Sequence, residues 1–584
     1  MAEGGDAQKG RRIAIIGVSS LLLVAMVIAV TVGANRNQNG FDDDIENNRK
    51  NHVSSTMRAV QSICQPTDYK KECVDTLTAE AEAGNVTDPK ELIKIAFNVT
   101  MKKIGEQIKA TDLMHEVEKD PRSKDAIDTC KQLMDLSIGE FARAMDGIDQ
   151  FDLKDIDRIL MNLKVWLNGA VTYMDTCVDG FQNTTTDAGK KMKDILTSSM
   201  HMSSNALAII SDFADTVTSW NVTKIFGRRL LDTDTPSWVS EHRMLLDAKT
   251  SSFKLKPNVT VALDGTGDVK TINEALLKVP EKSEKPFFIY IKEGVYNEYV
   301  EVGKHMTYVV FLGDGGQKSR ITGSKNFIDG VNTYKTASVA IQGDHFTAIN
   351  MGFENSAGAH KHQAVALRVQ GDKSIFFNCS MDGYQDTLYV HTMRQFYRDC
   401  TISGTIDFIF GNALSVFQNC KFVVRKPMAN QQCIVTAQGR KERFQPSAIV
   451  IQGGSIVADP EFYPVRFDHK AYLARPWKNF SRTIFMDTFI DDLIHPDGYM
   501  PWQTPEGFSG MDTCFYAEYH NYGPGSDKSK RVHWAGIWNL NSKAARWFAP
   551  SKFFHGSDWI EETGVPFFSS IPDHHRHKKT VLTW

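Results

Sequence analysis

The chain has 584 residues, too many for one ordinary domain, and its 42% hydrophobic and 23% charged content is that of folded globular protein. The formal net charge is −3, but residues 1–248 hold 29 Lys+Arg against 37 Asp+Glu, and residues 249–584 hold 38 against 33. No extended basic stripe of the kind used for nucleic-acid binding is present. We therefore expect two domains of opposite charge and no nucleic-acid partner.

The N-terminal segment predicts the compartment. A basic cytoplasmic segment, residues 1–12, precedes an uncharged apolar run over residues 13–34. These 22 residues can cross the ~30 Å core of a bilayer, and the basic flank directs the rest of the chain outward. We expect a membrane-spanning signal-anchor, with a cleavable signal peptide as the alternative. Residues 35–53 read as a polar linker, and the bulk of the protein enters the secretory pathway, toward the outside of the cell.

Asn-x-Ser/Thr sequons become glycosylation sites in that pathway. One sequon, at Asn378, falls inside a predicted strand, and we exclude it for that reason. The sites expected to carry glycans are Asn85, Asn98, Asn183, Asn221, Asn258 and Asn479.

Residues 54–215 have a helical period. Apolar residues recur in steps of three and four, as in the stripe that joins Ile156, Leu163, Trp166 and Tyr173. Several such stripes in succession predict an all-α, up-down helix bundle whose stripes form the core. No cluster of acids, histidines or cysteines on them suggests chemistry.

Four cysteines in this region are placed to form two disulfides, which the secretory pathway permits. Cys64 and Cys73 are close enough in sequence to close a small loop, and Cys130 and Cys177 can join two of the helices.

Residues 216–256 break the helical pattern and form a linker. The linker contains the sequence Gly-Arg-Arg-Leu-Leu, with a dibasic pair at Arg228 and Arg229 followed by Leu230 and Leu231. A dibasic pair in an exposed linker of a secreted chain is a site for a processing protease.

Residues 257–575 are rich in short β-type runs that repeat. The phrases IFFNCSM, FYRDCTI and VFQNCKF begin at Ile375, Phe396 and Val416, about one repeat of 20 residues apart. Such a period predicts an all-β solenoid, here a right-handed parallel β-helix in which each turn stacks on the last. Residues 576–584 form a tail, and the tract HHRHKK from His574 to Lys579, which runs into it, resembles a metal tract only superficially.

The repeat brings particular polar residues together. Gln363 lies 22 residues before Gln385, and Asp386 lies 21 residues before Asp407. Residues one period apart become neighbours on adjacent rungs, so two carboxylates and two amides converge on one face. By the same reasoning Cys400 and Cys420, 20 residues apart, fall within reach of a disulfide.

The β-rich region resembles the plant pectin methylesterases, in the long form with an N-terminal inhibitor-like pro-domain. The matching motifs are GVYNE at Gly294, QAVALR at Gln363, GYQDTL at Gly383, DFIFG at Asp407, TAQGR at Thr436 and YLARPW at Tyr472. The helical region with its four cysteines looks like the invertase/pectin-methylesterase inhibitor family, and GRRLL looks like the site where such pro-domains are removed. One departure is Ala474, where the family usually has Gly.

The resemblance implies hydrolysis of galacturonate methyl esters in pectin, with demethylated pectin and methanol as products. It assigns Asp407 as the nucleophile and Asp386 as the acid and base. It gives Gln385 and Gln363 as amide donors to the oxyanion, Arg475 as the partner of Asp407, and Trp477 and Thr333 as substrate contacts. It also implies cell-wall modification, no metal or other cofactor, and inhibition by the chain's own pro-domain or by a separate inhibitor protein.

Two other readings remain open. Paired carboxylates on a β-helix can hydrolyse a glycosidic bond, as in a polygalacturonase-like enzyme, although paired glutamines suit an acyl oxyanion better. Alternatively the chain is a wall-binding or inhibitor protein whose helical bundle is the active part. No Gly-x-Ser-x-Gly motif supports a serine-triad esterase.

Overall fold

The computed structural model describes residues 54–150, 155–182, 184–219 and 256–571, which fall into two compact units on either side of Leu230. The predicted membrane segment 13–34 with its flanks, the processing site Arg228–Leu231 and the tail 576–584 lie outside these residues. Among the described helices, none combines the length and apolarity that a membrane span requires. The anchor, the processing site and the domain limits therefore stay predictions.

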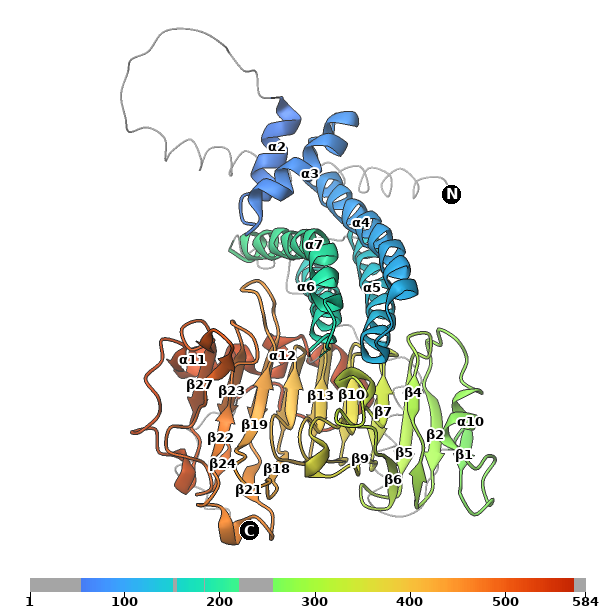
Figure 1. Cartoon of the computed structure of the whole chain (residues 1–584), viewed down its shortest axis with the longest axis vertical. Helices are drawn as coiled ribbons and strands as arrows, with labels where there is room; N and C mark the ends of the chain where they lie inside the picture. The colour runs from blue at the N-terminus through green and yellow to red at the C-terminus, as the bar shows by residue number, and fades with distance from the viewer. Residues whose placement is uncertain (1–53, 151–154, 183, 220–255, 572–584) are drawn as a thin grey trace, which may run out of the picture. The chain divides into compact units, whose positions relative to one another are not determined.

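The first unit consists of helices, as the 3.6-residue period predicted. They are α2 (Ser55–Cys64), α3 (Lys70–Ala83), α4 (Pro89–Val117), α5 (Pro121–Asp149), α6 (Ile156–Asp179) and α7 (Ala188–Ser219) (Figure 1). Two of the long helices, α4 and α5, each start with an Asp-Pro pair. Asp88 accepts from the Glu91 N–H at 3.1 Å and Asp120 from the Ser123 N–H at 2.8 Å, and each such cap is worth about 1 kcal/mol.

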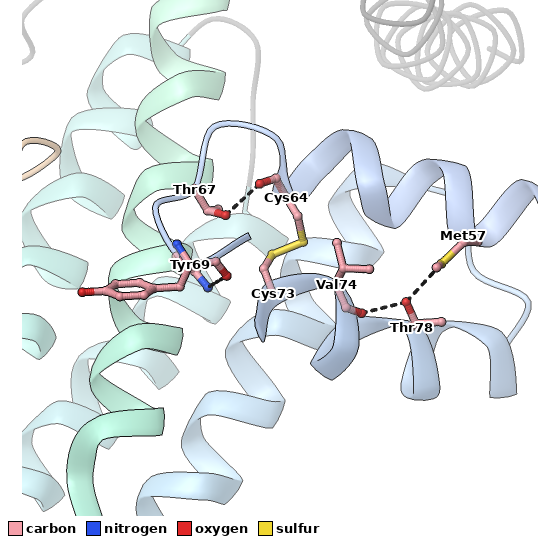
Figure 2. Close-up of a disulfide and its surroundings, with 8 residues drawn as sticks. Met57, Cys64, Thr67, Tyr69, Cys73, Val74 and Thr78 are labelled. Carbon is pink, nitrogen blue, oxygen red and sulfur yellow. Dashed lines mark hydrogen bonds between the residues drawn. A yellow bond between two sulfur atoms is a disulfide. The ribbon is translucent and has the colours of Figure 1, made fainter. Parts of the chain in front are cut away.

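Both disulfides predicted in the helical unit are present. Cys130–Cys177 joins α5 to α6, and Cys64–Cys73 joins the end of α2 to the start of α3 (Figure 2). In the α2–α3 turn, the Thr67 hydroxyl donates to the Cys64 carbonyl at 2.7 Å.

The α2–α3 pair is tied to α7 through Tyr69. The Tyr69 N–H donates to Asn205 Oδ1 at 3.3 Å, and Asn205 Nδ2 donates to the Tyr69 carbonyl at 3.1 Å. The Tyr69 ring stacks on His201 with centroids 3.6 Å apart. The bundle therefore has a packed attachment for its first two helices.

The second unit is a parallel coil of three long sheets, and the parallel β-helix prediction is confirmed (Figure 1). Sheet A contains β1 (Val259–Val261), β2 (Phe287–Ile291), β5 (Val309–Gly313), β8 (Thr347–Ile349), β11 (Ser374–Phe377), β14 (Arg394–Arg398), β17 (Leu414–Gln418), β20 (Ala448–Gln452), β23 (Arg482–Met486), β27 (Phe515–Tyr519) and β28 (Ile537–Asn539). Sheet B contains β3 (Gly294–Asn297), β6 (Ser319–Gly323), β9 (Gly352–Asn355), β12 (Ser380–Asp382), β15 (Thr401–Gly404), β18 (Lys421–Val424), β21 (Ser455–Ala458) and β24 (Phe489–Ile490). Sheet C contains β4 (Val300–Val302), β7 (Val339–Ile341), β10 (Leu367–Val369), β13 (Leu388–Val390), β16 (Ile409–Gly411), β19 (Cys433–Gln438) and β22 (Ala471–Ala474).

Shorter elements complete this unit. A capping box at Thr271 and Glu274 starts α10 (Ile272–Leu276), and a two-stranded hairpin is formed by β25 (Trp502–Thr504) and β26 (Gly507–Ser509). Three further short helices follow the last strand: α11 (Ser542–Ala545), α12 (Pro550–Phe553) and α13 (Ser557–Ile560).

Register within the coil follows the repeat. Leu367 pairs with Leu388, and Leu388 pairs with Ile409, so one turn of sheet C corresponds to 21 residues. Inside the coil Phe376, Tyr397 and Phe417 form a column of nearly parallel rings, with centroids 4.9 and 4.4 Å apart. Side chains one period apart thus pack on one another, which keeps successive rungs aligned.

The predicted Cys400–Cys420 disulfide is wrong: both residues are buried free thiols. They occupy matching positions on neighbouring rungs, because Thr401 pairs with Lys421 directly after them. In-register neighbours direct their Cα–Cβ bonds the same way, so the sulfurs stack, although rung spacing lies within the Cα range of disulfides. Each thiol donates instead to a backbone carbonyl, Cys400 to Phe376 at 3.4 Å and Cys420 to Tyr397 at 3.6 Å.

The glycosylation sequons divide into three groups. Asn85, Asn98, Asn258 and Asn479 are exposed, which is compatible with the predicted glycans, whereas Asn183 and Asn221 lie outside the described residues. The exclusion of Asn378 assumed a position inside a strand, but Asn378 lies between two strands. It is an exposed turn residue between β11 and β12, and its Nδ2 donates to Asn350 Oδ1 at 2.6 Å.

Removing the disulfides from the helical unit is expected to destabilise it unequally. In the chain-entropy account, the double substitution Cys130→Ala/Cys177→Ala removes a cross-link between residues 47 positions apart and lowers the free energy of unfolding by about 4 kcal/mol. Cys64→Ala/Cys73→Ala opens a separation of 9 residues and costs about 2.6 kcal/mol. Urea unfolding followed by helical circular dichroism measures both, and the reverse order of stabilities would contradict the assignment of loop closure as the main effect.

Candidate active site

The two aspartates lie on consecutive turns of the coil, each two residues before a strand of sheet C. Asp386 precedes β13 and Asp407 precedes β16, and the Asp386 N–H donates to the Ile406 carbonyl at 3.0 Å, which keeps the two turns in register. Both residues have left-handed backbones, with φ of 63° and 50°. Asp tolerates this conformation better than most residues, and it lifts the side chain away from the regular pleat.

Asp407 is held by a guanidinium. Arg475, directly after β22, donates from Nε to Oδ1 at 2.8 Å and from Nη2 to Oδ2 at 2.5 Å. The Asp407 side chain is 7% exposed and that of Arg475 is 20% exposed, so the pair is largely shielded from water. A bidentate contact of this kind fixes the orientation of the carboxylate.

Asp386 has a different environment. Burial and the neighbouring charge of Asp407 raise the pKa of Asp386 well above its ordinary value, and Arg475 offsets only part of this rise. Its carboxyl group makes no hydrogen bond to another described residue. Two adjacent carboxyl groups therefore have different environments, one in a bidentate ion pair with Arg475 and the other with a raised pKa.

The two glutamines lie beside these turns. Gln385 directly precedes Asp386, and its carbonyl accepts from the Ala364 N–H at 3.2 Å, which brings the Gln363 turn onto the adjacent rung. Both glutamines are half-buried. Gln363 Oε1 is buried and accepts no hydrogen bond from the residues that the structure describes.

Thr333 is linked to the same region through a short 3-10 turn, Thr333–Lys335. Its carbonyl accepts from Thr336 Oγ1 at 2.8 Å, and that same hydroxyl oxygen accepts from the Val365 N–H at 3.0 Å, two residues after Gln363. Thr333 itself is half-buried.

Trp477 packs beside β16, the strand that follows Asp407. Its ring meets the edge of Phe410 with centroids 5.8 Å apart, and it requires glycine at position 439, where a Cβ would lie 2.7 Å from Trp477 Cε3. Ala474, the departure from the family pattern, is the last residue of β22 and is fully buried, so its methyl group fills the core. Arg475 and Trp477 still follow it in the sequence, as the Arg and Trp of the family motif.

Aromatic residues that the sequence reasoning did not single out complete the surroundings. Trp502 of the β25–β26 hairpin covers Arg475, with the guanidinium carbon 4.4 Å from the ring centroid. Tyr389 and Phe410 stack with centroids 4.2 Å apart. The 21-residue period predicts the Tyr389–Phe410 pair, whereas Trp502 comes from an irregular loop and has no such signal.

Within the described ranges, no three His, Cys, Asp or Glu side chains gather in a group that could hold a metal ion.

Two family profiles match the chain. The pectinesterase profile matches residues 258–557, and the plant invertase/pectin methylesterase inhibitor profile matches residues 58–209. The first covers the coil and the second covers the helix bundle.

Relatives from Arabidopsis thaliana match along nearly the whole chain. The protein named pectinesterase/pectinesterase inhibitor 28 is 46% identical over 97% of this chain and 76% of its own length. The one named pectinesterase/pectinesterase inhibitor 21 is 47% identical over 97% of this chain and 83% of its own length.

A solved structure matches the second unit. The pectin methylesterase from carrot is 45% identical, with a TM-score of 0.54, and the match covers 55% of this chain and all of the carrot chain.

Replacing Asp386 with Asn is expected to stabilise the β-helix unit at pH 7 but not at pH 3. Below the pKa of the unfolded state, about 3.9, Asp386 is protonated in both the folded and the unfolded protein. As the pH rises from there toward the raised folded pKa, the unfolded state loses its proton first, so the free energy of unfolding falls. An Asn side chain is neutral throughout, so its advantage should grow by about 1.4 kcal/mol per pH unit above pH ~4. Unfolding curves at several pH values test this, and a pH-independent difference would contradict the raised pKa.

Proposed function

The chain belongs to the pectinesterase family, and we propose that its hydrolysis of pectin methyl esters uses Asp407 as nucleophile and Asp386 as acid and base. As a pectin methylesterase with an inhibitor-family domain, it is a carboxylic ester hydrolase. The observation that carries the proposed mechanism is the unequal environment of the two acids: Arg475 holds Asp407 in a bidentate ion pair, whereas Asp386 is buried and its pKa is raised.

In the first step, an oxygen of Asp407 attacks the C6 carbonyl carbon of a methylated galacturonate. Arg475 supports this role because it keeps the carboxylate charged and oriented. The C6–O bond to the methoxy group then breaks, and Asp386 gives its proton to the departing oxygen, so methanol leaves. The product is a mixed anhydride between Asp407 and the sugar.

In the second step, Asp386, now ionised, takes a proton from water, and the hydroxide attacks the acyl carbon. This regenerates the Asp407 carboxylate and leaves a galacturonate carboxyl group. A raised pKa of Asp386 suits both steps, because a group that is protonated at rest can donate first and accept later.

The glutamines support the developing negative charge. Gln385 directly precedes Asp386 and Gln363 lies on the adjacent turn, and amide donors aimed at an oxyanion are worth roughly 3–4 kcal/mol each in other acyl-transfer enzymes. The Trp477 ring offers an apolar face for a sugar, and Thr333 a polar contact at the Gln363 side. Trp502 shields the Arg475–Asp407 pair from water.

The helical unit serves as an inhibitory pro-domain in this proposal. Its family name describes inhibitors, and residues 54–215 carry 19 Lys+Arg against 27 Asp+Glu, opposite in sign to the catalytic half. Cleavage by a processing protease at Arg228–Leu231 then releases the active enzyme.

The site of action follows from the substrate and the N-terminal signal. Pectin lies in the plant cell wall, so the protein acts there after secretion, with a precursor that the segment 13–34 anchors in the membrane until processing. The exposed sequons Asn85, Asn98, Asn258 and Asn479 carry its glycans, together with Asn183 and Asn221.

Replacing the nucleophile is expected to abolish turnover without abolishing pectin binding. Asp407→Asn keeps the side-chain shape but cannot form the anhydride, so methanol release should fall by several orders of magnitude while pectin retention persists. Asp492→Asn is a matched control, because Asp492 also accepts both Nε and Nη2 of an arginine, Arg466, away from the site. Near-normal methanol release by Asp407→Asn would refute the assignment.

Adding the separate fragment 54–215 to the processed enzyme is expected to suppress methanol release. The opposite charges of the two parts predict weaker inhibition at high salt, where surface charges are screened. Titration of the fragment at low and high salt measures both effects. Unchanged activity at every fragment concentration would rule out autoinhibition.

A further inference from the structure

Arg425, the first residue after β18, spans two turns of the coil. Its Nη1 donates to the Gly383 carbonyl at 2.9 Å, its Nη2 donates to the Tyr384 hydroxyl at 2.8 Å, and its guanidinium carbon lies 3.8 Å from the centre of the Tyr384 ring. Gly383 and Tyr384 are the residues directly before Gln385 and Asp386. Three contacts from one side chain thus converge on the turn that carries the proposed acid and an oxyanion donor.

The backbone of Arg425 contacts the other proposed catalytic turn. Its N–H donates to the Gly404 carbonyl at 2.8 Å, three residues before Asp407. Gly383 stands in the same place relative to Asp386, also three residues before it. Arg425 therefore binds corresponding positions on both turns, with its main chain on one and its side chain on the other.

The two turns are already in close contact at this point, so a link between them can transmit position. The Thr405 N–H donates to the Tyr384 carbonyl at 2.8 Å. A Cβ on Gly404 would lie 2.7 Å from that carbonyl oxygen, so only glycine permits this approach.

A plain surface ion pair does not explain these contacts. The acidic partner of Arg425 is Asp459, whose Oδ2 lies 4.0 Å from Nε, at the limit of an ion pair. The short contacts are all to the Gly383–Tyr384 turn, and the side chain is only 29% exposed.

We propose that Arg425 is a positioning residue that fixes the Gly383–Asp386 turn relative to Asp407, and so sets the Gln385 amide and the Asp386 carboxyl against the ester. This inference rests on the roles proposed above for Gln385, Asp386 and Asp407. Because those groups act on the transition state, loss of their alignment lowers kcat and leaves KM nearly unchanged.

The test is steady-state methanol release by the secreted product of the full-length chain. Arg425→Ala is expected to lower kcat about ten- to hundredfold, with KM changed less than about twofold. Arg425→Lys, which can reach one acceptor but cannot keep both contacts, is expected to fall between Ala and the unchanged enzyme. Tyr384→Phe, which removes only the hydroxyl, is expected to lower kcat a few-fold.

Arg466→Ala is the matched control. Arg466 also pairs with an aspartate and lies over an aromatic ring, 4.0 Å from the centre of Tyr463, but it contacts neither turn. It should reduce thermal stability to a similar extent while leaving kcat unchanged. Should Arg425→Ala fail to fold, Arg425→Lys and Tyr384→Phe decide the question on the same readout.

A double-mutant comparison separates positioning from a general loss of structure. In a Gln385→Ala background, Arg425→Ala should cost less in kcat than it does alone, because part of its effect acts through Gln385. Unchanged kcat in Arg425→Ala, or full additivity with Gln385→Ala, overturns the proposal.

The outcomes also distinguish this inference from the mechanism beneath it. If Asp407→Asn and Gln385→Ala lose activity while Arg425→Ala does not, only the positioning role fails. If Asp407→Asn retains activity, the mechanism itself fails.

Discussion

The rung spacing of the coil, about 4.8 Å between neighbouring parallel strands, is the constraint on which the site depends. It places Asp386 and Asp407 on consecutive turns, where the registered hydrogen bond between their turns keeps them together. Two neighbouring carboxyl groups do not ionise equally. Arg475 pairs with Asp407, whereas burial and the neighbouring charge of Asp407 raise the pKa of Asp386. A regular scaffold thus produces two chemically different acids.

The regular coil and the irregular loops contribute different parts. The turns of the repeat supply the two acids and two glutamines, with left-handed backbones at both aspartates. The segments outside the regular repeat supply three further residues. Arg475 holds Asp407, Trp477 packs against Phe410, and Trp502 covers Arg475. Glycines at 404 and 439 allow these pieces to approach where a Cβ would collide. The regular stacking therefore sets the distance between neighbouring turns, and the residues outside the repeat set the charge environment of the two aspartates.

Much of this arrangement follows from the sequence, because a period is visible before any coordinates are. The 21-residue step between Asp386 and Asp407 correctly predicted neighbouring turns, and helical stripes with Cys130 and Cys177 correctly predicted a bridged bundle. Spacing alone failed for Cys400 and Cys420, because adjacency on a parallel ladder does not direct two side chains toward each other. Trp502 lies in a hairpin outside the repeat, and the side chain of Arg425 reaches across two turns of the coil, so the side-chain partners of both residues could be found only from the folded structure.

Trapping the acyl intermediate tests the central claim most directly. Enzyme turning over a methyl-esterified oligogalacturonide is quenched with hydroxylamine, which attacks a mixed anhydride and converts a carboxyl group in it to a hydroxamate. The account predicts, by peptide mass spectrometry, a substrate-dependent hydroxamate on Asp407 and none on Asp386. A hydroxamate on Asp386, or none on either aspartate or on the sugar while methanol is released at the normal rate, would contradict it.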